Sequence, residues 1–120
     1  MLVEGRPKRK TGELRDWLLH DEHRSIVVSP NTKDAKEAVL NYETLDVRDS
    51  ATLLKVMLGS GRYHQIRAQF AHAGCPVVGD ARYGSSFPYR HGCIALQHYC
   101  LSIEHPVTHE RMQFTSKIVL

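Results

Sequence analysis

A strand-like apolar run passes through a glycine turn directly into the start of a helix. The run covers residues 53–58 (LLKVML), Gly61 supplies the turn, and residues 62–69 (RYHQIRAQ) open the helix. This segment carries two arginines, Arg62 and Arg67, and one histidine, His64, which is positively charged when protonated. His64 and Arg67 lie three positions apart and therefore share one helix face. Because helix starts present free N–H groups and a positive dipole end, this turn predicts a place for a phosphate or a carboxylate.

The helix is predicted to span residues 64–73. Ile66, Phe70 and Ala73 recur at helical spacing and form an apolar stripe, with a stop signal in Gly74 and the proline two positions later. On the same segment, Gln65 is expected to make a structural hydrogen bond.

Alternation of apolar and polar residues predicts strands elsewhere in the chain. These strands cover residues 12–19, 25–29, 38–47, 52–58, 94–103 and 112–115. The short polar turn at 48–50 joins two of them, which predicts an antiparallel hairpin. The fold class that follows is α+β: a mixed, mostly antiparallel sheet with one main helix.

Composition favours one unit spanning residues 1–120. The chain has no Pro/Gly/Ser linker and no internal repeat, and its length suits one domain. Its net charge of +3 permits RNA binding without requiring it. Four basic residues crowd the N-terminal segment, where they form either a solvated loop or a contact with RNA phosphates: Arg6, Lys8, Arg9 and Lys10.

Cysteine usage and hydropathy predict a cytoplasmic protein without a membrane span. The three cysteines are an odd number with no framework spacing, and no apolar run approaches 18 residues. The chain opens without the apolar core of a signal peptide. The pairs His72/Cys75 and His98/Cys100 have ligand-like spacing, but neither forms a zinc knuckle, so no metal is predicted.

Three segments together resemble the RluA-like RNA pseudouridine synthases. The first is GRYHQIR at 61–67, which is similar to the family's G-R-x-H-Q-I-R. The second, CPVVGD at 75–80 followed by RYG at 82–84, resembles H-P-[IV]-[LV]-G-D-x-x-Y-G. The third, LSIEHPVT at 101–108, resembles L-x-F-x-H-P-V-T. The order and spacing match, and the resemblance extends more loosely to residues 2–5 and 12–47.

The resemblance implies that the chain is the C-terminal portion of a pseudouridine synthase catalytic domain. The family's nucleophilic aspartate lies in an upstream H-R-L-D segment, which these 120 residues do not contain. Arg67 matches the family arginine that orients this aspartate. Arg62 and His64 are expected to contact RNA, although His64 could equally orient the turn backbone. Asp80 is expected to fix its own loop and not to be the missing nucleophile.

Three hypotheses follow. In the first, the chain is a fragment of an enzyme that converts uridine to pseudouridine in rRNA or tRNA without cofactor or metal, and it is inactive alone. Its partners are then RNA and the missing N-terminal half, or a second copy of itself. In the second it is a non-catalytic RNA-binding module, and in the third a small metal-binding protein. If half a sheet is absent, the apolar face that includes Leu53, Ile66, Phe70 and Ile94 is expected to lack part of its cover.

Overall fold

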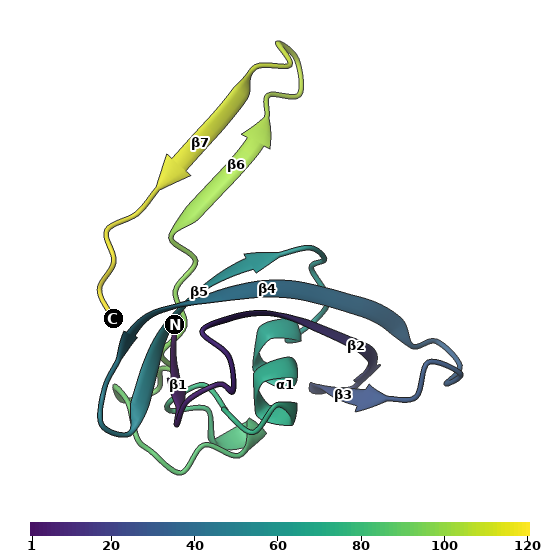
Figure 1. Cartoon of the computed structure of the whole chain (residues 1–120). Helices are drawn as coiled ribbons and strands as arrows, with labels where there is room; N and C mark the ends of the chain where they lie inside the picture. Colours follow the sequence, from purple (N-terminus) through teal and green to yellow (C-terminus); the bar gives the residue numbers. More distant parts are fainter.

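A computed structural model describes all residues from 1 to 120 and contains two antiparallel sheets and one α-helix (Figure 1). The larger sheet has the strand order β1-β5-β4-β2-β3, and the smaller is a β6–β7 hairpin. Along the chain the elements are β1 (Leu2–Glu4), β2 (Thr11–Asp21), β3 (Arg24–Val28), β4 (Lys36–Val47), β5 (Ala51–Leu58), α1 (Gln65–His72), the 3₁₀ turn η1 (Ala81–Tyr83), β6 (Cys100–Glu104) and β7 (Arg111–Thr115). The predicted α+β class with one main helix is confirmed.

The β4–β5 hairpin forms where alternation predicted it. Its turn at 48–50 is closed by the N–H of Arg48, which donates to the carbonyl of Ala51 over 2.8 Å. The two strands pair antiparallel, with a bulge between Thr44 and Asp46. Alternate residues of β4 are buried, among them Leu40 and Tyr42, because successive side chains of a strand point to opposite faces.

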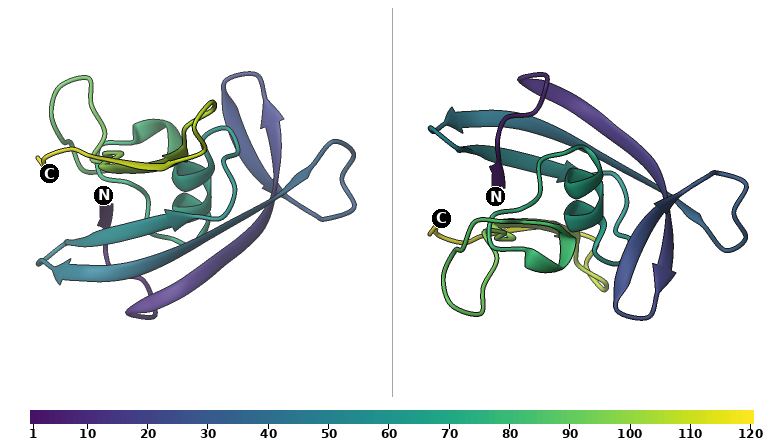
Figure 2. Two further views of the ribbon diagram at one scale, coloured as in Figure 1. Left: turned by 90° about the horizontal axis from the view of Figure 1, so that it is seen from above. Right: turned by 90° about the horizontal axis from the view of Figure 1, so that it is seen from below.

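The helix α1 packs on the face of the large sheet to which these buried residues point, and the sheet arches over it (Figures 1 and 2). Phe70 is almost fully buried there and meets the Tyr42 ring edge-on at a centroid distance of 5.7 Å. Leu40 and Leu54 complete this part of the core. The predicted helix of 64–73 is thus confirmed to within one residue at each end, although Ala73, placed in the apolar stripe, is exposed.

The outer side of β1 is occupied by irregular chain. Residues 76–78 and 94–96 exchange backbone hydrogen bonds with β1 and with each other, including Val78 N–H to the Leu2 carbonyl at 3.0 Å and Leu2 N–H to the Ala95 carbonyl at 2.9 Å. The prediction of one strand over 94–103 is therefore wrong for its first six residues. Ala95 is buried and most of the others are partly covered, but these residues form no ladder, and only Cys100–Glu104 is strand.

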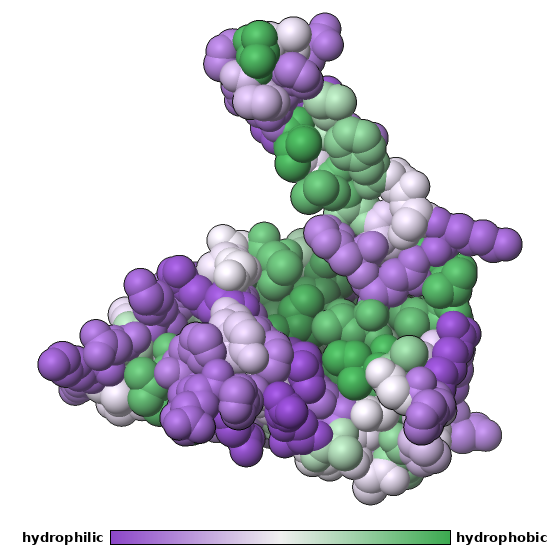
Figure 3. All heavy atoms as spheres, turned by 180° about the vertical axis from the view of Figure 1, so that it is seen from behind, coloured by the Kyte–Doolittle hydropathy of each residue, from purple (hydrophilic) through white to green (hydrophobic).

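The β6–β7 hairpin projects away from the rest of the molecule (Figure 1). The register pairs Leu101 with Phe114 and Ile103 with Met112, so one face of the hairpin is apolar. Figure 3 shows apolar surface running from the hairpin into the hollow at its base. The radius of gyration, 15.2 Å, exceeds the value of about 13.6 Å expected for a compact chain of this length.

The apolar surface left without cover differs from the one expected. Phe70 is buried, and Leu53, Ile66 and Ile94 pack partly buried against the core. The exposed apolar residues instead lie mainly at the ends of β4 and β5, on the hairpin and near the C-terminus: Leu45, Val47, Met57, Leu58, Leu101, Ile103, Phe114, Ile118 and Val119. The α1 helix contributes no residue to this surface, because β2, β3 and η1 pack against it and its Phe70 is buried.

No helix in the structure has both the length and the apolar character needed to cross a bilayer.

Candidate active site

Arg67 and Asp80 form a bidentate ion pair at the centre of the candidate site. The guanidinium donates through Nε and Nη2 to the two carboxylate oxygens, each over 2.8 Å. The Asp80 side chain is 1% exposed and that of Arg67 is 20% exposed. Hydrogen bonding to Asp80 raises the pKa of Arg67 above its already high value. This pair therefore fixes the guanidinium plane with charge-assisted hydrogen bonds.

His64 contacts Nη1, the third nitrogen of the same guanidinium group. Its Nε2 lies 3.0 Å from Nη1 of Arg67, and its Nδ1 lies 2.8 Å from the Tyr83 hydroxyl. An arginine can only donate, so Nε2 accepts and the proton of the neutral ring sits on Nδ1. Burial lowers the pKa of His64, and the positive charges of Arg67 and Arg82 lower it further. The neutral imidazole is thus the form that the site favours.

Tyr83 ties this cluster to the sheet. Its hydroxyl accepts the backbone N–H of Ser25 in β3 at 2.9 Å, besides its contact with His64. Its buried ring lies 4.9 Å from the guanidinium carbon of Arg67, within cation–π distance. Arg67 is consequently held by the acid and the aromatic ring of the 80–83 segment and by the imidazole at the start of its own helix.

Arg67 thus has an acidic partner within the chain, which the sequence interpretation did not foresee. Of its five N–H groups, three are used by Asp80 and His64, and one remains on each of Nη1 and Nη2. Asp80 does fix its loop as expected, since its carbonyl accepts the N–H groups of Tyr83 and Ser85. Its carboxylate has the additional task of orienting Arg67. The G-D-x-x-Y-G match was the one sequence signal that pointed to Asp80 and Tyr83.

Hydrogen bonds within the chain stabilise the turn before the helix. The side-chain oxygen of Gln65 accepts from the Arg62 N–H and from the Ser60 hydroxyl, and its amide donates to the Val39 carbonyl. The prediction of a structural hydrogen bond for Gln65 is confirmed. Arg62 directs its Nε to the carbonyl of Glu37 in β4, so it does not join the Arg67 cluster.

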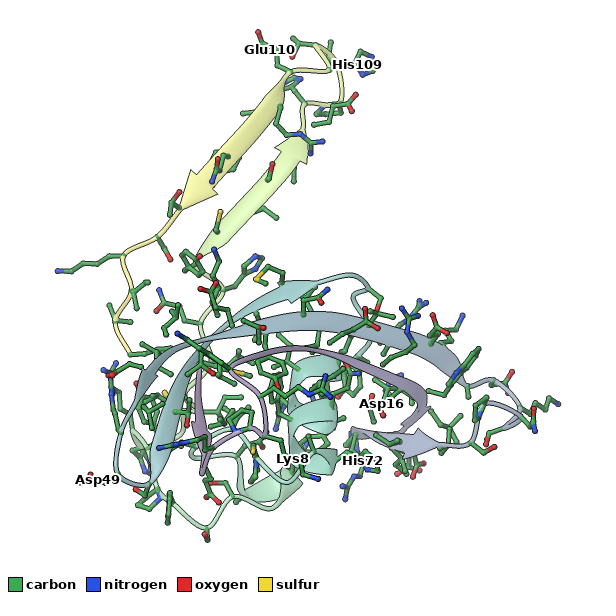
Figure 4. All side chains as sticks on the ribbon, in the orientation of Figure 1. Lys8, Asp16, Asp49, His72, His109 and Glu110 are labelled. Carbon is green, nitrogen blue, oxygen red and sulfur yellow. The ribbon has the colours of Figure 1, made fainter.

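The basic loop between β1 and β2 lies at the other end of α1. Arg6, Lys8, Arg9 and Lys10 are all exposed. Lys8 borders a separate cavity of about 240 Å³ together with Ala73, at the end of the helix. Figure 4 shows Lys8 and His72 in this region. The structure therefore brings His64 to Arg67 but keeps the basic loop apart from them, and its contact with RNA stays a prediction.

A cavity of about 520 Å³ opens beside Arg67 and Asp80. Its other wall is the loop of residues 81–93, which contributes Arg82, Arg90 and His91. Gly79 lets this loop approach closely: it has φ +86°, and a Cβ added there would meet Tyr89 Cβ at 2.7 Å and the Cys93 carbonyl at 2.9 Å. No site residue was predicted in this loop from the sequence.

The candidate metal ligands remain pairs. His72 and Cys75 flank the end of α1, and His98 and Cys100 precede the hairpin. No group of three or more His, Cys, Asp or Glu side chains comes together as a metal centre would require.

Comparison with known proteins identifies the family. The model of the family described as RNA pseudouridylate synthase matches residues 1–72. An uncharacterised RNA pseudouridine synthase of Bacillus subtilis is 36% identical over 113 residues, which cover 94% of this chain and 39% of that protein. Ribosomal large subunit pseudouridine synthase D of Pseudomonas aeruginosa is 34% identical over 96 residues, which cover 69% of this chain and 30% of that protein. The chain belongs to the RNA pseudouridylate synthase family.

The fold agrees with this assignment. The solved structure of human RNA pseudouridylate synthase domain containing 1 superposes with a TM-score of 0.80 at 20% identity. The match covers 98% of this chain and 52% of the human one. The chain thus spans about half the length of that structure and about two fifths or less of the curated relatives given above.

Proposed function

We propose that this chain is the arginine-bearing part of an RNA pseudouridine synthase, and that it isomerises uridine in RNA together with an upstream segment that supplies an aspartate. The observation that carries the proposal is the preorganised Arg67. Its guanidinium is fixed by Asp80, His64 and Tyr83, and it still has one N–H on each Nη for a second carboxylate. The partial coverage of the relatives supports a missing segment.

The chemistry explains why a fixed arginine is useful. The target uridine leaves the helical stack so that its C1′ becomes accessible. The N1–C1′ bond breaks, the uracil rotates, and a C5–C1′ bond forms, while C5 loses a proton and N1 gains one. Every atom of the substrate is retained, so the isomerisation consumes no co-substrate. The aspartate either bonds C1′ or removes a proton. In either route Arg67 would hold the acid in place and stabilise its charge.

The substrate is proposed to be ribosomal or transfer RNA. The name of the Pseudomonas aeruginosa relative favours ribosomal RNA of the large subunit. The three free cysteines suit a reducing compartment, and we propose action in the cytoplasm.

The experiment combines the chain with an upstream segment that carries H-R-L-D, either fused or as a second chain. Pseudouridine in total cellular RNA is then measured by carbodiimide primer extension or by mass spectrometry. We expect no product from the 120-residue chain alone and product from the combination. Arg67→Lys should lose most of this activity, because lysine keeps the charge but not the two-pronged geometry.

The matched control is Arg15→Lys, which changes an arginine whose ion pairs with Glu13 and Glu37 are about half exposed. It should leave activity unchanged. Conversion of uridine by the chain alone, or full activity of Arg67→Lys, would contradict the proposal.

The second candidate is a non-catalytic RNA-binding module, and the exposed basic loop of residues 6–10 favours it. RNA binding by the chain, without any activity in the combined protein, would select this alternative.

A further inference from the structure

We propose that the loop of residues 81–93 forms a phosphate-binding wall that grips the RNA strand beside Arg67, with Arg82 and Arg90 as its charged contacts. The inference rests on the proposed function, since it names the part of the RNA that this site would hold. It concerns the half of the cavity opposite Arg67 and Asp80, to which the sequence interpretation assigned no role.

The charge balance of the cavity is the first argument. Its lining contains three arginines but a single carboxylate, that of Asp80. Both oxygens of this carboxylate are taken by Arg67. Arg82 and Arg90 have no acidic partner, and each makes one side-chain hydrogen bond to a backbone carbonyl, of His23 and Val119 respectively. Two arginines without an acidic partner therefore line one open cavity, which is an electrostatic arrangement suited to an anion.

The loop that carries these arginines is anchored, which is the second argument. One carboxylate oxygen of Glu4 accepts from the Ser85 hydroxyl at 2.7 Å and from the N–H groups of Ser86 and Phe87 at 2.6 and 2.9 Å. Burial alone would raise the pKa of Glu4, but these hydrogen bonds outweigh it and lower the pKa. The carboxylate is thus charged at neutral pH and keeps the loop against β1. Arg90 also lies 5.2 Å from the ring of Tyr89. A contact surface that is fixed beforehand loses less conformational entropy when a ligand binds.

Backbone N–H groups in the cavity wall provide hydrogen-bond donors in addition to the two arginines. The N–H groups of Arg90, His91 and Gly92 make no hydrogen bond within the chain, and all three residues line the cavity. Guanidinium groups and backbone N–H groups are the donors that proteins use for phosphate oxygens. The cavity volume of about 520 Å³ lies within the range of roughly 300–1,000 Å³ that small-molecule sites have.

The openness of the site to one side favours a phosphodiester strand over a free phosphate. Arg82, Arg90 and His91 are exposed, so the arginines lie on the rim of the cavity and not at its base. A strand could pass along this rim and place one of its nucleotides next to Arg67. A free phosphate would instead need enclosure to bind tightly, because exposed charges are screened by salt.

The test measures binding of the 120-residue chain to a fluorescein-labelled oligouridylate of about ten nucleotides, a length within the site sizes of single-strand binders. Fluorescence anisotropy at several salt concentrations gives Kd and its salt dependence. The double variant Arg82→Ala/Arg90→Ala should bind at least about tenfold more weakly. Its slope of log K against log salt should be smaller by about 1.4, since each phosphate contact on a single strand contributes about 0.7.

The matched control is the double variant Arg48→Ala/Arg111→Ala, which removes the same charge from exposed arginines outside the cavity. It should retain the affinity and the slope of the wild type more closely. Equal losses in the two double variants, or no loss in Arg82→Ala/Arg90→Ala, would overturn the proposal. Circular dichroism of both variants verifies that they are folded, and the charge-preserving Arg82→Lys/Arg90→Lys should recover most of the binding.

Two further ligands separate the possible sources of the phosphate. Inorganic phosphate and uridine 5′-monophosphate are titrated as competitors against the labelled strand. If either displaced it at the strand's own Kd, the site would be one for a small phosphate and the assignment to RNA would fail. Activity of the chain combined with its upstream segment is measured separately, so an intact activity without arginine-dependent binding would refute this inference while leaving the proposed function standing.

Discussion

Replacing Asp80 with asparagine tests whether the buried carboxylate is what holds Arg67. The change keeps the size of the side chain but removes its charge and one of the two acceptors that face the guanidinium. Removing one partner of a buried ion pair costs about 3–5 kcal/mol, because the other charge stays desolvated. Arg67 is one-fifth exposed and keeps its contact with His64, so part of this cost is recovered through solvent. We expect a loss of about 2–3 kcal/mol in the free energy of unfolding.

The chain contains its own reference pair for this measurement. Arg48 and Asp46 are 3.2 Å apart, with side chains that are 47% and 56% exposed. Exposed pairs of this kind contribute about 0–1 kcal/mol. Asp46→Asn should therefore cost less than about 1 kcal/mol in the same background.

Urea unfolding, followed by circular dichroism and by the fluorescence of Trp17, measures both changes. A double-mutant cycle that adds Arg67→Gln to Asp80→Asn gives the coupling between the two residues directly. The coupling should be at least about 1 kcal/mol. If Asp80→Asn costs no more than Asp46→Asn, or if the cycle shows no coupling, then the ion pair is not what fixes Arg67 and the argument for a preorganised guanidinium falls.

Three further predictions concern pH, loop packing and association. The lowered pKa of His64 means that the unfolded chain binds more protons than the folded one just below pH 6.5, so stability should fall as pH falls through this region. Asparagine tolerates the left-handed φ of 52° at position 64, so His64→Asn should keep the turn and reduce the pH dependence of stability. Urea melts at pH 7 and pH 5 measure this dependence. An equal loss of stability between the two pH values in the variant and the wild type would contradict the prediction. Gly79→Ala should disturb the 81–93 loop and weaken binding of the oligouridylate, whereas Gly84→Ala, at a positive φ but with open space around it, should cost stability with less effect on binding. The apolar face of the β6–β7 hairpin should make the isolated chain associate, and Phe114→Ser should reduce this in sedimentation velocity; a wild-type chain that is monomeric at all concentrations would argue against it.

The periodicity of apolar residues was sufficient to predict the helix and most strands, because in these segments the pattern of buried side chains follows the period of the backbone structure. Segment 94–99 shows where they separate. Ala95 is fully buried between half-buried neighbours, but the backbone of the segment makes only isolated hydrogen bonds, among them those to β1, Val78 and Ser116. Alternation reports which side chains are covered and not whether a neighbouring strand completes a ladder. That depends on where β1, at the opposite end of the sequence, lies.

The Arg67–Asp80 pair was missed for a related reason. The two residues are thirteen positions apart, and a helix end, the Gly74 turn and the 75–79 segment have to fold back before they meet. Arg67 could be selected from the G-R-x-H-Q-I-R resemblance, and Asp80 could be recognised as a turn residue. Neither observation contained the contact between them, because the contact is set by the packing of Cys75, Val77 and Val78 into the core.

The presence of Asp80 changes what Arg67 can contribute to a second acid. A free guanidinium would supply a full positive charge, but this one is already balanced by a buried carboxylate. Its main contribution is then geometric: two N–H groups held at fixed positions by Asp80, His64 and Tyr83. The net positive charge of the cavity comes instead from the exposed arginines on the 81–93 loop. The aspartate of the proposed upstream segment would accordingly be positioned by one arginine and kept ionised in a potential set by others. Arg67→Lys and the loss of Arg82 and Arg90 should then impair the proposed combined enzyme in different ways. The first change should act chiefly on kcat, and the second chiefly on KM for RNA and on its salt dependence.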